Sequence, residues 1–381
     1  MSHSVAEMMP PQLPILEGSG VIYRKAELDD NETIKSILRS NSMDSWVMLS
    51  SEHEPNYFAS NNLFGTAQTI IARENDIKSS AVGICSSVVM PVHINGEIVN
   101  AGYLGNLRVE PGFRHKVSVL RDGFKSIRMI TENKKALAYW FTSIAKENTS
   151  ARRLLEANLR GMPKYKPQGE LLTLALSTRL GKISPLLERA CDDDISALAQ
   201  FYNKQVSHYQ YSPVMTEQWL KGLNGINGLC LNDFWLLKRD GVIQACFALW
   251  DQRKLKQTVV RGYRFPLNIF RQPYNIYARL SDRVALPARG EKIDYIFIAF
   301  LAIDEVYGSE IEVIIRSALS LIKERGAKMG MLGLSTKNPL LQRLENLPRQ
   351  IYRTCIESVT WLGQSENEID AIPAQPEIAI L

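Results

Sequence analysis

The sequence predicts an α+β protein made of two copies of one unit, each a mixed, mostly antiparallel sheet flanked by helices. The chain has 381 residues, which is more than one domain usually holds. Strand and helix patterns then follow the same order twice. A short stretch of sequence also repeats: KENTSARRLLEANLR (146–160) is similar to TKNPLLQRLENLPR (336–349), and Asn148 aligns with Asn338. We therefore expect two tandem domains that divide near residue 181.

The first copy is expected to begin with a strand and a helix. Asp29, Asp30 and Asn31 supply N-cap chemistry for a helix that runs through Ser40. Asn95-Gly96 is a strong hairpin signal between two long strands. Strands are predicted at 21–26, 67–74, 79–94, 98–109, 136–144 and 170–176, and further helices after Pro111-Gly112 to about 133 and at 149–158.

The second copy repeats this order after residue 182. Cys191 and three aspartates open a helix as Asp29 and Asp30 do in the first copy. Strands are predicted at 185–190, 234–239, 242–250, 293–303, 329–335 and 357–362, and helices at 309–325 and from Asn338. The predicted organisation is a flexible leader (1–20), an N-terminal domain (21–181), a C-terminal domain (182–363) and a tail (364–381).

Composition excludes several classes of protein. The longest apolar run, Tyr295–Ile303, is about half the length of a membrane-spanning helix, so no membrane association is expected. Five cysteines without a C-x-x-C pair favour a reducing, cytoplasmic setting. The five histidines form no set of metal ligands, so no metal is expected.

Positive charge gathers in one part of the chain. Residues 108–166 hold 14 Lys and Arg against 5 Asp and Glu, an excess of 14 − 5 = +9. Such a stretch suits an anionic partner, for example a phosphate group or an acidic carrier protein, or it forms solvated helix faces. Nucleic acid is not expected as a partner, because no nucleic-acid-binding motif accompanies the charge.

The element order, together with the segment LGNLRVEPGFRHKVSVLRDGFK (104–125), resembles the GNAT (Gcn5-related N-acetyltransferase) superfamily of acyl-CoA-dependent N-acyltransferases. The segment matches the family's L-x-V-x-P-x-x-R pattern from Leu107 to Arg114. The resemblance implies that acetyl-CoA or another acyl-CoA is the substrate and that the following loop wraps its pyrophosphate. A helix N-terminus receives phosphate there through its unpaired N–H groups.

The resemblance also assigns candidate site residues. It implies that backbone groups of Leu107 and Val109 polarise the thioester carbonyl. The residues that it implies for cofactor binding are Val109, Arg114, His115, Lys116, Val117, Ser118, Val119 and Asn148. Asn148 is equally well explained as a helix N-cap.

This sequence departs from the family pattern at three positions. Val117 and Val119 stand where the family has small residues that admit the phosphate. Leu155 stands where the family often has a tyrosine that protonates the departing thiolate. Glu110 is the candidate base, although neighbouring arginines would lower its pKa and a salt bridge explains it as well. The second copy places Asp304, Glu305 and Glu310 in the equivalent loop, where their charge would repel a pyrophosphate. The first copy is therefore the better candidate for the cofactor site.

Three functions follow from these features. The leading hypothesis is an acyl-CoA-dependent N-acyltransferase that uses the N-terminal copy and a small-molecule or peptide amine as acceptor. A non-catalytic GNAT-like module that binds a ligand or a partner is the second. The third is an acyltransferase whose donor is an acyl-carrier protein, because that donor lacks the pyrophosphate of coenzyme A. The acceptor and the acyl length are left open.

Overall fold

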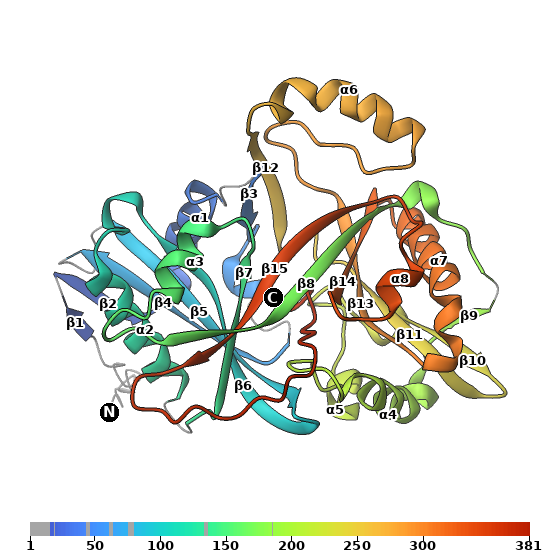
Figure 1. Cartoon of the computed structure of the whole chain (residues 1–381), viewed down its shortest axis with the longest axis horizontal. Coiled ribbons are helices and arrows are strands. Elements are labelled where there is room, and N and C mark those ends of the chain that lie inside the picture. Colours follow the sequence, from blue (N-terminus) through green and yellow to red (C-terminus); the bar gives the residue numbers. More distant parts are fainter. Residues whose placement is uncertain are drawn as a thin grey trace, which may run out of the picture.

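The structure of the protein is a computed structural model that describes residues 16–18, 20–42, 46–60, 64–74, 80–132, 136–184 and 186–381. Of the leader predicted over 1–20, residues 1–15 and 19 lie outside the described residues. One 13-stranded sheet runs through both halves of the molecule, in the order β1-β2-β4-β5-β6-β7-β15-β8-β14-β13-β11-β10-β9. Helices pack against the sheet in each half, which gives two lobes (Figure 1). Among the described residues, no helix is long and apolar enough to cross a lipid bilayer.

The first lobe follows the predicted order closely. Its strands are β1 (Leu16–Gly18), β2 (Val21–Lys25), β4 (Thr66–Glu74), β5 (Ala81–Ile94), β6 (Glu97–Val109), β7 (Tyr139–Ala145) and β8 (Lys164–Ser177). Its helices are α1 (Asn31–Ser40), α2 (Val117–Thr131) and α3 (Thr149–Glu156). The strand β8 begins at Lys164 and not near 170. Its first residues are mostly exposed and include Pro167 and Gly169, which hides the strand pattern in the sequence.

The second lobe repeats this order. Its strands are β9 (Leu187–Arg189), β10 (Phe234–Arg239), β11 (Val242–Trp250), β13 (Tyr295–Ile303), β14 (Met329–Ser335) and β15 (Arg349–Thr360). Its helices are α4 (Ile195–Val206), α5 (Glu217–Lys221), α7 (Ile311–Glu324) and α8 (Leu340–Arg343). The repeat extends to side chains: the Asp30 carboxylate accepts the Glu27 N–H (2.9 Å) just as Asp194 accepts the Cys191 N–H (3.1 Å).

The two copies exchange their last strands. The strand β15 belongs to the second copy in sequence, yet it lies between β7 and β8 of the first. In return, β8 pairs with β14 over seven residue pairs, from Met329↔Ser177 to Ser335↔Leu171. The two long strands cross the middle of the molecule together (Figure 1). A division at 181 therefore describes the repeat along the chain, while the lobes in space share strands.

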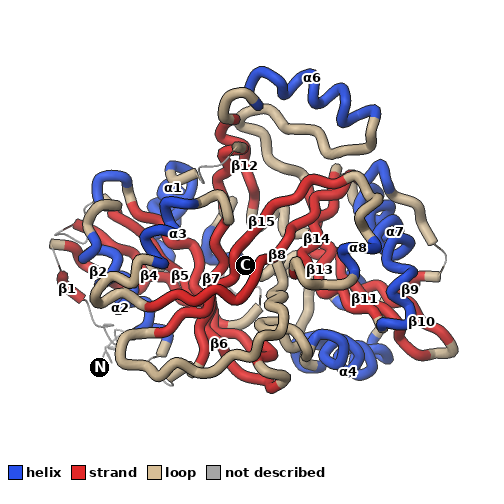
Figure 2. Tube along the Cα trace, viewed as in Figure 1, coloured by secondary structure: helices blue, strands red, loops and turns tan. Residues whose placement is uncertain are grey.

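An arm between β11 and β13 was not predicted from the sequence. It begins with β12 (Gln257–Tyr263), which pairs with β3 (Val47–Glu52) of the first copy in a separate two-stranded sheet. The arm continues into α6 (Leu267–Leu280), which projects from the rest of the molecule (Figure 2) and is joined to β15 by a hydrogen bond from Gln350 to the Tyr274 hydroxyl (2.8 Å). The pairing of β3 with β12 joins the two copies a second time.

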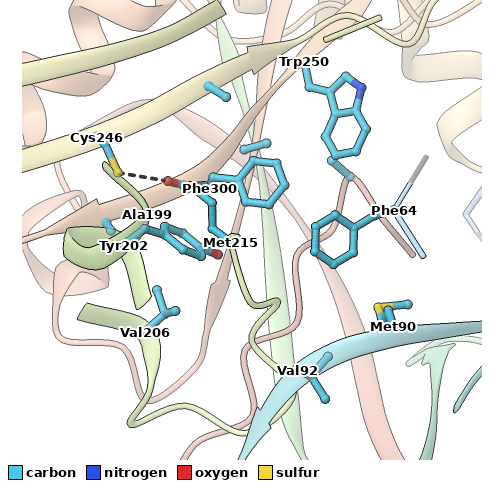
Figure 3. Packing of buried hydrophobic residues seen from close by; sticks show 14 of the residues in the cluster. Phe64, Met90, Val92, Ala199, Tyr202, Val206, Met215, Cys246, Trp250 and Phe300 are labelled. Carbon is cyan, nitrogen blue, oxygen red and sulfur yellow. Dashed lines mark hydrogen bonds between the residues drawn. The ribbon is translucent and has the colours of Figure 1, made fainter. Parts of the chain in front are cut away.

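Buried aromatic residues close the seam between the lobes. Phe64 of the first copy lies against Trp219 and Phe300 of the second, with ring centroids 5.1 and 6.2 Å apart. Trp250 also stacks on Phe300, with ring centroids 5.7 Å apart. Figure 3 shows this cluster, which continues from Met90 and Val92 of β5 to helix α4. The lobes thus share one apolar core, and their relative position is fixed by packing.

Candidate functional site

The strands β6 and β7 separate near the middle of the first lobe. They pair in parallel from Ala101↔Tyr139 to Leu104↔Thr142. Beyond Leu104 the strand β6 continues to Val109, and β7 pairs instead with β15 on its other side. Two parallel strands that part in this way leave a wedge-shaped opening in the sheet.

A β-bulge marks the point of separation. The register with β5 shifts between Ile84↔Arg108 and Ser86↔Gly105, so Asn106 and Leu107 together oppose Cys85. Asn106 has φ +50°, a left-handed conformation that asparagine tolerates better than most residues. A bulge leaves its extra residue outside the regular ladder and turns the local backbone groups aside. Backbone polar groups can therefore face the opening here, at the place where the sequence predicts a role for the Leu107 backbone.

The opening forms a cavity of about 350 Å³. Strands of both copies line it, together with residues of the tail. Apolar side chains make up much of the wall, namely Leu104, Phe124, Ile144, Leu155, Leu171, Phe297, Ile378 and Leu381. Four tyrosines also line it: Tyr103, Tyr165, Tyr295 and Tyr352. An apolar cavity with a few polar groups is typical of a small-molecule site.

Two cationic side chains reach this cavity. The Arg108 guanidinium donates from Nη1 to the carbonyl of its own neighbour Leu107 (2.9 Å), while its Nε is buried with no hydrogen-bond partner in the described part of the chain. Lys256 comes from the loop before β12, and its Nζ donates to the Leu381 main-chain oxygen (2.6 Å). No Asp or Glu side chain is among the described residues that line the cavity. The charged side chains of the described lining are thus both cationic.

Burial shifts the protonation of both cations. Burial, reinforced by the positive charge of Arg108, lowers the pKa of Lys256 to about 8. Burial also lowers the pKa of Arg108. The pKa of nearby His53 falls to about 3, first because it is buried and then because Lys256 and Arg108 repel a third positive charge. His53 is therefore neutral at ordinary pH, and the pKa of Lys256 lies close to ordinary pH.

The predicted pyrophosphate loop leads directly into helix α2. Arg114, His115 and Lys116 are exposed before the helix, which begins at Val117. The first N–H groups of any helix lack acceptors within it, so the amides of Val117 and Ser118 are the donors this turn offers. The strong positive end of a 15-residue helix adds to them.

The two valines do not fill the loop. The Val119 side chain is 3% exposed and packs inward with Tyr23 and Leu120. Its N–H bonds the Lys116 carbonyl (3.0 Å), and its own carbonyl accepts from the Tyr23 hydroxyl (3.0 Å). Val117 packs against the same cluster. The two valine side chains, which the sequence predicts near a phosphate, thus pack in the core of the first lobe.

The remaining predicted residues make structural contacts. Arg114 donates to Asn41 Oδ1 (2.6 Å) and to the Val109 carbonyl (2.9 Å), and Asn41 donates to the Glu110 carboxylate (2.9 Å). This network ties the end of α1 to the end of β6. Asn148 lines the cavity and also caps α3, since its side chain accepts the Ala151 N–H (3.2 Å).

The second lobe has the same bulge at the same place. There the register shifts between Cys246↔Ala302 and Ala248↔Ala299, and Phe300 has φ +51°. Its parallel strands β13 and β14 pair only from Tyr295↔Met329 to Phe297↔Met331. Phe300 thus corresponds to Asn106 of the first lobe.

The tail enters the opening of the second lobe. The Glu377 carboxylate accepts the Phe300 N–H (2.8 Å), and Gln375 accepts the N–H of Ser335 (3.0 Å) on the opposite strand. A cavity of only about 20 Å³ remains beside these residues, against about 350 Å³ in the first lobe. A Cβ on Gly333 would lie 2.4 Å from the Ile378 side chain, so the tail fits closely. The sequence predicted that residues 378–381 could dock, and the whole segment 374–381 packs into the molecule.

Glu377 makes this contact sensitive to pH. Burial raises the pKa of its carboxyl group to about 7, although three backbone N–H groups oppose the rise. The folded state therefore holds the proton more tightly than the unfolded chain. The stability that this protonation provides is complete below about pH 4.5 and is lost as the pH rises through 7.

We expect Glu377→Gln to remove this dependence. The wild-type protein should lose on the order of 2–3 kcal/mol of unfolding free energy, relative to E377Q, between pH 5 and pH 8. Urea unfolding of both proteins at the two pH values measures the difference. Glu345, which is exposed, gives the matched control E345Q. A wild-type and an E377Q stability that change in parallel with pH would contradict the prediction.

Sequence reasoning missed Arg108, Lys256 and Asn106 as site residues. Arg108 was visible only as part of a strand motif, and Lys256 lies in a segment without a motif. Gly105-Asn106 inside a strand pattern was the available signal for the bulge, because both residues tolerate backbone conformations that strands lack. Leu155 stands where the GNAT family often has a tyrosine. Tyrosines from other elements line the cavity in this chain, including Tyr352 of the exchanged strand β15.

Comparison with solved structures identifies the fold. The crystal structure of Saccharomyces cerevisiae N-myristoyltransferase with bound myristoyl-CoA matches with a TM-score of 0.61 and 11% identity, covering 98% of this chain and 92% of that one. A second structure of that enzyme with myristoyl-CoA gives a TM-score of 0.59, 12% identity, and coverage of 98% and 90%. A GCN5-related glucosamine N-acetyltransferase region of a fungal multi-domain GH3 β-N-acetylglucosaminidase gives 0.56 and 13%, covering 92% of this chain and 39% of that one.

These likenesses confirm the predicted α+β architecture of two GNAT-like lobes. No protein-family model matches the sequence, and no curated protein is similar enough to count as a relative. At 11–13% identity the likeness establishes the fold.

Proposed function

We propose that this protein is an acyl-CoA-dependent N-acyltransferase whose first lobe binds the acyl-CoA. The observation that carries the proposal is the difference between two equivalent openings. In the second lobe the Glu377 carboxylate accepts the N–H of the bulge residue Phe300. In the first lobe the bulge residue Asn106 lines an open cavity. An oxygen of a ligand, such as a thioester carbonyl, would take in the first lobe the place that Glu377 takes in the second.

The fold likeness supports the class of donor. The N-myristoyltransferase structures contain bound myristoyl-CoA and share this arrangement of lobes. In the present chain the N-terminus of α2 would bind the pyrophosphate through the amides of Val117 and Ser118. The basic side chains of His115 and Lys116 stand beside it. The apolar wall of the cavity would receive the acyl chain, acetyl or longer.

Three groups would carry out the transfer. The bulge amides at Asn106 and Leu107 would bind the carbonyl oxygen, and the Arg108 guanidinium would stabilise the negative charge that develops as the amine attacks. Neutral Lys256 would take the proton from the attacking amine. The new C–N bond then forms, the C–S bond breaks, and the ammonium of Lys256 returns the proton to the thiolate. In this scheme Glu110 holds Asn41 and is not the base.

The donor site is tested by placing a carboxylate at the start of α2. Ser118→Glu suits a helix N-terminus and should not destabilise the fold, but it repels a pyrophosphate. We expect affinity for acetyl-CoA and longer acyl-CoAs to fall at least about tenfold, from a loss of about 1.4 kcal/mol or more. Titration calorimetry measures it. Ser196→Glu, in the exposed first turn of α4, is the matched control.

Acyl-pantetheine separates the alternatives, because it lacks the pyrophosphate. It should bind the wild-type protein and S118E equally well. Transfer from acyl-pantetheine or an acyl-carrier protein, with none from acyl-CoA, would contradict the proposal in favour of a carrier donor. Binding of acyl-CoA without turnover across a panel of peptide and small-molecule amines would identify a non-catalytic module. Equal acyl-CoA affinity for S118E and the wild type would place the donor elsewhere.

A further inference from the structure

Helix α6 presents its apolar side to solvent. Large apolar side chains occupy successive turns along its outer face and at its entrance, with Phe265 77%, Ile269 65% and Leu280 84% exposed. Phe270, Ile276 and Tyr277 are more than half exposed and extend the same face. Their spacing of three, four and seven residues makes one continuous stripe. We call this set of six residues the α6 face.

The polar side of the helix faces the protein. Asn275 bonds both the N–H and the carbonyl of Leu286 (2.7 and 3.0 Å), and Arg271 donates to the same carbonyl (3.2 Å). The Tyr274 hydroxyl donates to the Val284 carbonyl (3.3 Å) and accepts from Gln350 of β15 (2.8 Å). The usual arrangement of a surface helix, with its apolar side toward the core, is reversed here. These bonds hold the α6 face outward in a defined orientation.

Positive charge surrounds the α6 face. The segment 264–289 contains five arginines and one acidic residue, Asp282, a net charge of 5 − 1 = +4. Arg279 lies on the exposed part of the helix between Ile276 and Leu280, and Arg289 is exposed in the returning loop. A second copy of the chain would bring the same positive charge against itself, which disfavours self-association through this face. An anionic surface would complement it.

We propose that the α6 face docks on a membrane surface rich in anionic lipid. An amphipathic helix with a large apolar side and flanking arginines lies in the interface between headgroups and acyl chains. The helix projects at the far end of the arm (Figures 1 and 2), and the α6 face is exposed, so a flat surface can reach it. The expectation of no membrane contact rested on the length of apolar runs, which tests for spanning and not for surface binding. The inference does not depend on the acyl-transfer proposal.

Vesicle co-sedimentation tests the proposal without any acyl-CoA. Vesicles of phosphatidylcholine and phosphatidylglycerol at about 3:1 should bind the wild-type protein at low salt, and vesicles of phosphatidylcholine alone should bind it far more weakly. Arg279→Gln should weaken binding roughly fivefold, the factor for one unit of charge near an anionic surface. Ile276→Asp and Leu280→Asp should each abolish measurable binding.

Matched controls place aspartate at equally exposed apolar positions elsewhere. Ile226 is 73% and Val306 80% exposed, and neither lies on the arm. Ile226→Asp and Val306→Asp should bind vesicles as the wild type does. Failure of the wild-type protein to bind anionic vesicles at low salt would overturn the proposal, as would equal losses in the controls. A dimer that I276D dissociates, seen by analytical ultracentrifugation without vesicle binding, would assign the face to a second copy instead.

Discussion

Lys256→Met is expected to lower the rate of acyl transfer by about a hundredfold to ten-thousandfold, the usual contribution of a proton-transfer group. Lys256 lines the first-lobe cavity together with Arg108 and the bulge residue Asn106. Acyl-CoA affinity should change little, because the pyrophosphate would bind at the start of α2. Steady-state kinetics and calorimetry on the same preparations separate the two quantities.

The pH profile gives a second reading of the same group. Because the pKa of Lys256 is lowered to about 8, its neutral, proton-accepting form is a minority at pH 7 and dominates above pH 8. The wild-type kcat/KM should therefore rise with pH and level off above about 8. This inflection should vanish in K256M and also in K256R, whose guanidinium stays protonated.

Lys254 provides the matched control because it lies in the same loop and is exposed. Lys254→Met should keep both the rate and the inflection. A K256M protein that transfers acyl groups at the wild-type rate would remove Lys256 from the mechanism. An inflection near pH 8 that persists in K256M would belong to another group.

The fold could be predicted from the sequence where local signals were strong. The hairpin strands at 234–239 and 242–250 agree with β10 and β11 residue for residue, because a turn at Asp240-Gly241 separates two apolar runs. The exchange of β8 and β15 was beyond such reasoning. Each strand carries an alternating pattern that fits any neighbour with an apolar face, so pattern alone does not select the partner.

The candidate site was predictable to a smaller extent, because local sequence patterns do not show which distant segments meet. The strand at 98–109 and a helix after Pro111-Gly112 were predicted, and the structure has β6 and α2 there, because these signals are contiguous in sequence. Lys256 and the tail reach the first-lobe cavity from about 150 and 270 residues further along the chain. Only the packed lobes bring them to Arg108. The sequence pattern predicts that Val119 crowds a bound phosphate. The structure buries this side chain in the core instead, and that outcome depends on which side of helix α2 faces inward.

Arg108→Met is expected to lower the rate about a hundredfold to a thousandfold, the cost of removing one group that stabilises charge in the transition state. Arg108 lines the first-lobe cavity, and its Nη1 donates to the Leu107 carbonyl (2.9 Å), so the guanidinium is held beside the bulge. Arg108→Lys keeps the charge but not the planar donors, and should recover part of the rate. Arg152→Met, on α3 and paired with Glu156, is the control for loss of an arginine in the same lobe.

The R108M variant also tests whether Arg108 and Lys256 influence each other, because its pH profile reports on the pKa of Lys256. The positive charge of Arg108 is one of the two causes that lower the pKa of Lys256, the larger being burial. Without that charge the Lys256 ammonium is less disfavoured, so its pKa rises toward its ordinary value near 10.5. The inflection in kcat/KM should therefore move above pH 8 in R108M and stay in place in R152M. An R108M protein that is slow but keeps the wild-type inflection would show that the two cations do not act in one site.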